Sequence, residues 1–153
     1  MVAIDLPDEK ATEALAARLA AVAHAGDVIA LQGELGAGKT SFARAFIRAR
    51  GGDESVPSPT FTLVQTYDLP GGAVWHFDLY RLRAPEEAWE LGIEDAFHDG
   101  ISLIEWPERL GALLPARRLL VSLEFAATPS ARRATLTANG DWLERLSHFG
   151  AEA

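Results

Sequence analysis

The stretch GELGAGKT, residues 33–40, has residue types and a spacing that can bind phosphate. It fits the pattern G-x-x-x-x-G-K-[ST], in which glycines let the backbone curl and point its N–H groups at phosphate oxygens. Lys39 would supply a positive charge to the β- and γ-phosphates, and the Thr40 hydroxyl would bind Mg²⁺. An apolar run precedes the stretch and a helical pattern follows it, so a helix would present its positive end to the same anion. The candidate nucleotide-binding residues of this loop are Glu34, Leu35, Gly36, Ala37, Gly38, Lys39, Thr40 and Ser41.

Two acidic residues stand at the ends of predicted strands, where a phosphate-binding loop needs a second group on the metal side. Asp78 ends the run VWHFD, and Glu105 ends the run ISLIE. Such carboxylates hold Mg²⁺ through water or polarise the attacking nucleophile. An ordinary acid at the exposed end of a strand would look the same in sequence. Asp78 and Glu105 are therefore candidates for both catalysis and metal binding, and the sequence does not separate their roles.

Four further residues near these groups each have a functional and a structural interpretation. Thr60, in SPTF, is either a switch residue that senses the γ-phosphate or part of an ordinary proline turn. His76 alternates with Asp78, so both should lie on one strand face, where a lone histidine is more often structural than catalytic. Arg81 either stabilises phosphate charge or contacts a partner, or it forms a surface salt bridge. Trp106 either lies close to the nucleotide or is a core aromatic residue at a strand end.

The elements that must position these residues alternate between helices and strands. Apolar spacing predicts helices and β-branched runs predict strands, and LPGG and TPSA predict the turns of two antiparallel hairpins. The fold class expected is α/β, a P-loop NTPase-like three-layer sandwich whose mixed, mainly parallel central sheet is flanked by antiparallel hairpin strands. The predicted helices cover residues 8–23, 39–50, 85–97 with a break at Gly92, 107–114 and 141–149, and the predicted strands cover 27–32, 61–68, 73–80, 101–106, 118–125 and 132–138.

Length and composition exclude several classes of protein. The chain has 153 residues, which predicts a single domain over 1–153 with its own core. Its net charge of -8 argues against a charge-driven grip on DNA or other nucleic acid. It has no cysteine, no apolar run of about 20 residues and no signal-peptide pattern at its start, so we expect a cytoplasmic protein without a membrane segment.

Beyond the phosphate loop, the chain resembles a known family, TsaE (formerly YjeE). The stretches that carry the resemblance are GELGAGKTSFARAF, PSPTFTLVQTY, HFDLYRL and ISLIEWPER, which lie between Leu31 and Arg109 in the family's order. The loop alone would fit many ATPases, whereas the combination with SPTF, H-x-D-x-Y-R and IEWPER is far more specific. The resemblance implies that Lys39 and Thr40 bind phosphate and Mg²⁺, that Thr60 is the switch threonine, and that Trp106 lies close to the nucleotide. It also implies catalytic or metal-side roles for Asp78 and Glu105.

The resemblance implies a function as well. It predicts a small bacterial ATPase that binds ATP and Mg²⁺, hydrolyses ATP slowly when alone, and acts on a complex of the TsaD and TsaB proteins. That complex makes threonylcarbamoyladenosine at position 37 of tRNAs reading ANN codons, and contact with tRNA would be indirect.

Two other hypotheses remain open from the sequence. The first is a P-loop kinase of a small metabolite, for which Arg117 and Arg118 are the nearest candidate lid arginines. The second is a nucleotide-gated binding module without hydrolysis, in which Asp78 and Glu105 would be dispensable. A GTPase is disfavoured, because the guanine signature N-K-x-D does not occur in the sequence.

Overall fold

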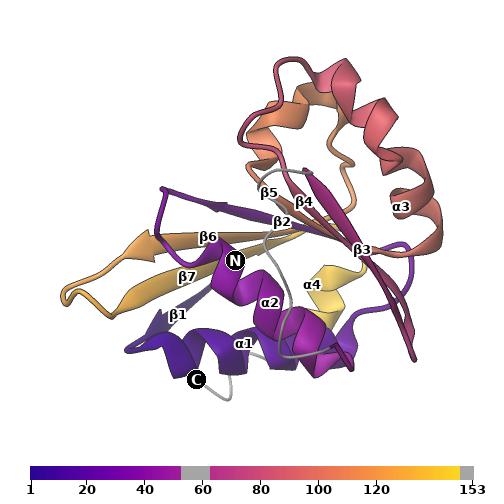
Figure 1. Cartoon of the computed structure of the whole chain (residues 1–153). Helices are drawn as coiled ribbons and strands as arrows, with labels where there is room; N and C mark the ends of the chain where they lie inside the picture. Colours follow the sequence, from indigo (N-terminus) through magenta and orange to yellow (C-terminus); the bar gives the residue numbers. More distant parts are fainter. Residues whose placement is uncertain (53–62, 149–153) are drawn as a thin grey trace.

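The computed structural model describes residues 1–52 and 63–148, and its described part contains a mixed sheet of seven strands. The strand order is β1-β7-β6-β2-β5-β4-β3 (Figure 1). The four strands β6, β2, β5 and β4 pair in parallel, whereas β3, β7 and β1 join the two sides of this centre through antiparallel pairs. The strands are β1 (Val2–Leu6), β2 (Val28–Gly33), β3 (Val64–Leu69), β4 (Gly72–Asp78), β5 (Ile101–Glu105), β6 (Leu119–Phe125) and β7 (Arg132–Ala138).

Helices cover both faces of this sheet and complete the three layers. On one face, α1 and α2 lie side by side, and α4 packs into the same apolar cluster. On the other face, η1, α3 and η2 pack against β4, β5 and β2 (Figure 1). The helices are α1 (Glu9–Val22), α2 (Lys39–Ala49), α3 (Ile93–Asp99) and α4 (Trp142–Arg145), and the 3₁₀ segments are η1 (Pro85–Leu91), η2 (Pro107–Leu113) and η3 (Leu146–His148).

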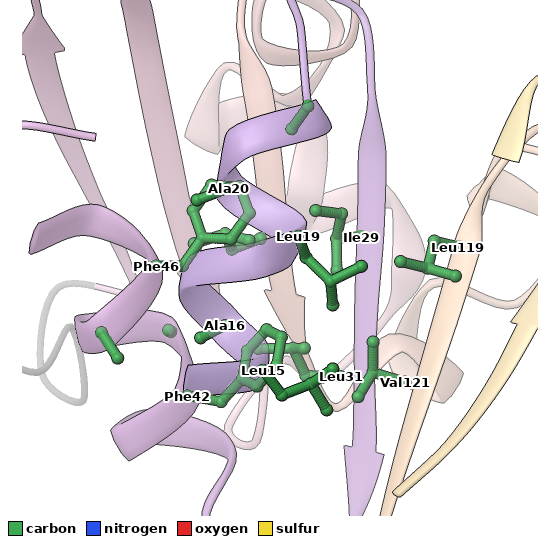
Figure 2. Packing of buried hydrophobic residues seen from close by; sticks show 14 of the residues in the cluster. Leu15, Ala16, Leu19, Ala20, Ile29, Leu31, Phe42, Phe46, Leu119 and Val121 are labelled. Atoms are coloured by element: carbon green, nitrogen blue, oxygen red, sulfur yellow. The ribbon is translucent and has the colours of Figure 1, made fainter. Parts of the chain in front are cut away.

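Local sequence explains why α1 forms and how it packs against α2 and the sheet. Asp8 caps α1, because its carboxylate accepts the Ala11 N–H at 2.9 Å. The apolar residues of α1 recur at helical spacing and so form one buried stripe. Figure 2 shows this stripe packed between α2 and the sheet. The labelled residues of this packing are Leu15, Ala16, Leu19 and Ala20 of α1, Phe42 and Phe46 of α2, Ile29 and Leu31 of β2, and Leu119 and Val121 of β6.

The predicted fold class is confirmed, with corrections at the ends of elements. β4 ends at Asp78 and not at Tyr80, and β5 ends at Glu105 because Trp106 adopts a left-handed backbone conformation. The closing helix predicted over 141–149 is the single turn of α4 followed by η3, and residue 149 lies outside the described part. The strand β1 was not predicted. It pairs with β7, seen from Val2 opposite Leu136 to Leu6 opposite Arg132.

None of the helices in residues 1–52 and 63–148 has the length and apolar character needed to cross a membrane.

Candidate functional site

The parallel register of the central strands brings the two predicted acids to the phosphate loop. Asp78 at the end of β4 lies opposite Glu105 at the end of β5, and Glu105 lies opposite Leu31 of β2. The loop begins at Gly33, where β2 ends. Because the carboxyl ends of parallel strands share one edge of a sheet, these three segments meet there, at the usual position of ligand sites in open α/β sheets.

The loop itself depends on glycine at two points. A Cβ atom on Gly33 would lie 2.6 Å from the carbonyl oxygen of Leu123 in β6, so a larger residue would clash with the neighbouring backbone. Gly38 has a φ angle of 108°, in the left-handed region that favours glycine, and it is the N-cap of α2. No side chain caps this helix end. The first N–H groups of α2 are thus available to an anion at the loop.

Lys39 is buried beneath the loop with two contacts. Its Nζ donates to the carbonyl oxygen of Gly33 at 2.6 Å and lies 3.2 Å from the centroid of the Trp106 ring. Burial lowers the pKa of the Lys39 ammonium, and the carboxylates of Glu105, Glu108 and Asp78 oppose that shift. Burial removes much of the hydration of the ammonium charge, so an anionic ligand such as phosphate would stabilise it.

Glu105 links the loop helix to the central strands. Its Oε1 accepts a hydrogen bond from the Thr40 hydroxyl at 2.9 Å, and its Oε2 lies 2.6 Å from Nε2 of His76 in β4. Glu105 and His76 are both almost fully buried. The hydroxyl and carboxylate oxygens of Thr40 and Glu105 are the hard ligands that Mg²⁺ takes in proteins, with substrate phosphates and water filling its other positions. This pair of oxygens therefore fits a magnesium ion.

Asp78 lies beside this pair in a different environment. Burial raises the pKa of the Asp78 carboxyl, and the Glu105 carboxylate raises it further. The Tyr80 N–H, which donates to Oδ1 at 3.2 Å, and the charges of His76 and Lys39 act in the opposite direction. A carboxylate with a raised pKa is a stronger base than an ordinary carboxylate, so it accepts a proton more readily.

Trp106 forms one wall of the site because of its backbone. Its φ and ψ angles are 60° and 52°, a conformation that is uncommon for a residue with a bulky side chain. This turn ends β5 and lets Pro107 begin η2. The Trp106 ring lies 4.9 Å from the Tyr80 ring between centroids, at an angle of 54°. The Trp106 ring thus lies beside the loop, in contact with Lys39, and its closeness to a bound nucleotide stays a prediction.

These groups surround one cavity of about 370 Å³. Its size lies within the range of small-molecule sites, about 300–1,000 Å³. Glu34 and Ala37 belong to the loop but do not line this cavity, and Thr60 lies outside the described residues. The lining residues are Leu35, Gly36, Gly38, Lys39, Thr40, Ser41, Asp78, Tyr80, Arg81, Glu105 and Trp106.

Comparison with known proteins supplies the family. The sequence model of a family described as threonylcarbamoyl adenosine biosynthesis protein TsaE matches residues 6–134. The chain belongs to the TsaE family. A relative named tRNA threonylcarbamoyladenosine biosynthesis protein TsaE from Rickettsia bellii is 42% identical, over 78% of this chain and 84% of its own length. A protein of the same name from Bacillus subtilis is 38% identical, over 92% of this chain and 86% of its own length.

A solved structure agrees with this membership of the TsaE family. The crystal structure of YdiB from Bacillus subtilis superposes with a TM-score of 0.79 at 31% sequence identity. The superposition covers 99% of this chain and 94% of YdiB. The comparisons therefore support the TsaE resemblance and the P-loop fold, and they do not favour the small-metabolite kinase.

The positions of Arg117 and Arg118 also weaken the kinase hypothesis. Both precede β6, which runs parallel to β2, so they lie at the edge of the sheet opposite the phosphate loop. Arg117 pairs with Asp141 at 3.1 Å, and Arg118 donates to the carbonyl oxygen of Pro115 at 2.9 Å. Neither residue lines the cavity beside Lys39.

One residue at the loop was missed by sequence reasoning. Arg132, at the start of β7, donates through Nε to the carbonyl oxygen of Ala37 at 3.1 Å and through Nη2 to that of Gly36 at 3.2 Å. Its guanidinium also lies 4.6 Å from the centroid of the Phe125 ring. No motif marks this residue, because a pair of arginines after a turn reads as a surface feature. Its role is visible only once β6 and β7 lie beside β2.

Proposed function

We propose that this protein binds ATP with Mg²⁺ and hydrolyses it, and that it serves in the biosynthesis of threonylcarbamoyladenosine in tRNA. The observation that carries the proposal is the convergence of four groups on one cavity at the phosphate loop: Lys39, Thr40, Asp78 and Glu105. Membership of the TsaE family supplies the pathway, as the names of its relatives state it.

Each group receives a role from its contacts. Lys39 and the N–H groups at the start of α2 bind the phosphates, because they place positive charge around the same space. Thr40 and Glu105 hold Mg²⁺, since their oxygens lie 2.9 Å apart. The ion, when bound, offsets the charge of the phosphate oxygens. Asp78 orients the attacking water and takes up its proton, because its pKa is raised and it does not share the Thr40 contact.

Two exposed side chains beside the cavity support a protein partner. Leu35 and Tyr80 line the cavity, and 75% and 48% of their respective surfaces are exposed. Exposed apolar and aromatic side chains beside a ligand site are typical of a surface that another protein covers. We assign this role to the TsaD–TsaB pair, on which the family resemblance places ATP use. The net charge of -8 is consistent with an indirect link to tRNA in the cytoplasm.

Two substitutions separate nucleotide binding from hydrolysis. Lys39→Ala removes the buried cation and is expected to abolish tight ATP binding. Glu105→Ala is expected to retain nucleotide binding at saturating Mg²⁺ and lose turnover. The matched control is Lys10→Ala, because Lys10 is the other lysine of the chain and is exposed. Calorimetric titration with ATP and release of inorganic phosphate measure the two steps. Near-unchanged ATP affinity in a folded Lys39→Ala variant would remove the phosphate-loop assignment, and full turnover in Glu105→Ala would remove its catalytic role.

A further inference from the structure

His76 is a buried histidine for which packing alone gives no reason. It lies in the middle of β4 with none of its surface exposed, and its Nε2 is 2.6 Å from Oε2 of Glu105. Its other ring nitrogen, Nδ1, is buried and has no hydrogen-bond partner among the described residues. A buried polar atom without a partner destabilises the folded state, so an apolar side chain would suit this position better if filling space were the only requirement.

The contact with Glu105 is what the histidine adds. A carboxylate oxygen can only accept, so Nε2–H donates to Oε2 of Glu105 while the Thr40 hydroxyl donates to Oε1. The terminal torsion of a glutamate side chain is soft and has broad minima, so one contact does not fix the plane of its carboxylate. Two donors on opposite oxygens, from β4 and from α2, do fix it.

The sequence builds this chain of contacts from three elements. His76 and Asp78 lie on the same face of β4, and Glu105 lies at the matching end of the adjacent parallel strand β5. Thr40 is the second residue of α2, directly after Gly38 and Lys39. The sheet register therefore sets the distance from His76 to Glu105, and the loop sets the distance from Glu105 to Thr40.

We propose that His76 is a positioning residue, which holds Oε2 of Glu105 so that Oε1 faces the Thr40 hydroxyl and these two oxygens are placed to bind Mg²⁺. The inference rests on the proposed function, because it assumes the magnesium site. Residues that orient a metal ligand from behind typically change metal affinity by about 10- to 100-fold when they are lost. His76 thus acts through Glu105 and does not touch the nucleotide.

The test compares two variants of His76, and the quantity measured is the Mg²⁺ concentration needed for nucleotide binding. His76→Gln keeps an N–H donor near the place of Nε2, whereas His76→Leu has a similar volume and no donor. Binding of a fluorescent ATP analogue is titrated with Mg²⁺ and, separately, measured in EDTA. We expect His76→Leu to raise the half-maximal Mg²⁺ concentration about tenfold with unchanged affinity in EDTA. We expect His76→Gln to restore most of the loss.

A second pair keeps the test decisive if His76→Leu does not fold. His76→Asn is polar like His76→Gln, but its shorter amide does not reach Glu105, so it should raise the Mg²⁺ requirement where His76→Gln does not. Equal Mg²⁺ requirements in the folded variants and the wild type would overturn the positioning role while leaving the magnesium site in place. A wild-type protein whose nucleotide binding is indifferent to Mg²⁺ would overturn the proposed function, and this inference with it.

Discussion

The contact between Lys39 and Trp106 is the feature of the site most open to direct observation. The Lys39 ammonium lies 3.2 Å from the centre of the indole, a cation–π arrangement that alters the electronic surroundings of the ring. A phosphate group would compete for the same ammonium, because a point charge is attracted more strongly to an anion than to the face of an aromatic ring. The ring therefore reports on the occupation of the loop.

We expect the tryptophan fluorescence of the protein to change when ATP is added. The chain has three other tryptophans, Trp75, Trp89 and Trp142, and none of them lines the cavity. The measurement is a fluorescence titration of the wild type and of Trp106→Phe with ATP. A change of equal size in Trp106→Phe would mean that another tryptophan carries the signal and that Trp106 is not beside the nucleotide.

The raised pKa of Asp78 predicts a pH-dependent effect on stability. A carboxyl group whose pKa is higher in the folded than in the unfolded protein favours folding below its unfolded pKa, and this contribution is lost as pH rises through the folded value. At neutral pH the ionised Asp78 is therefore unfavourable, and Asp78→Asn should raise the free energy of unfolding. The gain should shrink as pH falls through the raised pKa and disappear below the ordinary value of about 3.9.

Chemical denaturation of both proteins between pH 3.5 and 8, values chosen to bracket about 3.9 and neutrality, measures this difference. Asp68→Asn is the matched control, because Asp68 lies exposed on β3 and its replacement should change stability by less than about 0.5 kcal/mol. A gain for Asp78→Asn that is the same at every pH would show that the effect is not electrostatic.

At the scale of elements, the β6–β7 hairpin supports the phosphate loop from outside. Arg132 donates to the carbonyl oxygens of Gly36 and Ala37. A peptide unit is planar and trans, so its C=O and N–H groups point in opposite directions. Arg132 holds the Ala37 carbonyl toward β7, so the N–H of Gly38 points away from the hairpin. The orientation of this N–H toward a bound anion is thereby fixed.

Arg132→Gln should weaken ATP binding by about tenfold, which corresponds to about 1.4 kcal/mol. The expected loss follows from removing two charge-assisted hydrogen bonds to the loop. Arg133→Gln removes the same charge from an exposed neighbour and should bind ATP as the wild type does. Calorimetric titration with ATP measures both variants. Equal losses in the two would indicate a general effect of charge, and no loss in Arg132→Gln would show that the loop holds its shape without the hairpin.

Sequence predicted the elements of the central sheet better than their ends. The runs before Asp78 and Glu105 were predicted as strands because both are apolar and rich in β-formers, and the two acids then fell at one edge of the sheet through the parallel register. The predicted ranges 73–80 and 101–106 nevertheless extend past these two acids. At β5 no feature of the sequence marks the left-handed conformation of Trp106, which is uncommon for a bulky residue. The strand β1 was missed since its only partner, β7, is distant in sequence.

Sequence also found the candidate ligands more readily than their supports. Lys39 and Thr40 stand in a motif of defined spacing. The two loop residues that Arg132 contacts, in contrast, precede it by 95 and 96 positions in the sequence. The pairing of His76 with Glu105 was likewise hidden, although the alternation of His76 and Asp78 correctly predicted their shared face. The sequence does not separate the roles of Asp78 and Glu105. The hydrogen bond from the Thr40 hydroxyl to Glu105 is the observation that distinguishes them.

At the scale of the whole molecule, the cavity lies at one edge of the sheet, where a partner protein can reach it. Leu35 and Tyr80 border the cavity and are exposed, so a partner protein placed there would contact the nucleotide's surroundings directly. Such an arrangement lets a partner change the rate of hydrolysis by completing or ordering the site. We therefore propose that ATP turnover is coupled to the TsaD–TsaB pair.

The most direct test of this coupling is the Mg²⁺-dependent release of phosphate from ATP by the purified protein, alone and with the TsaD–TsaB pair from the same organism. We expect slow turnover alone and clear stimulation by the pair, with Glu105→Ala inactive in both conditions. Turnover that is unchanged by the pair would contradict the coupling. The protein would then be an ATPase with a phosphate-binding loop whose activity does not depend on this pair.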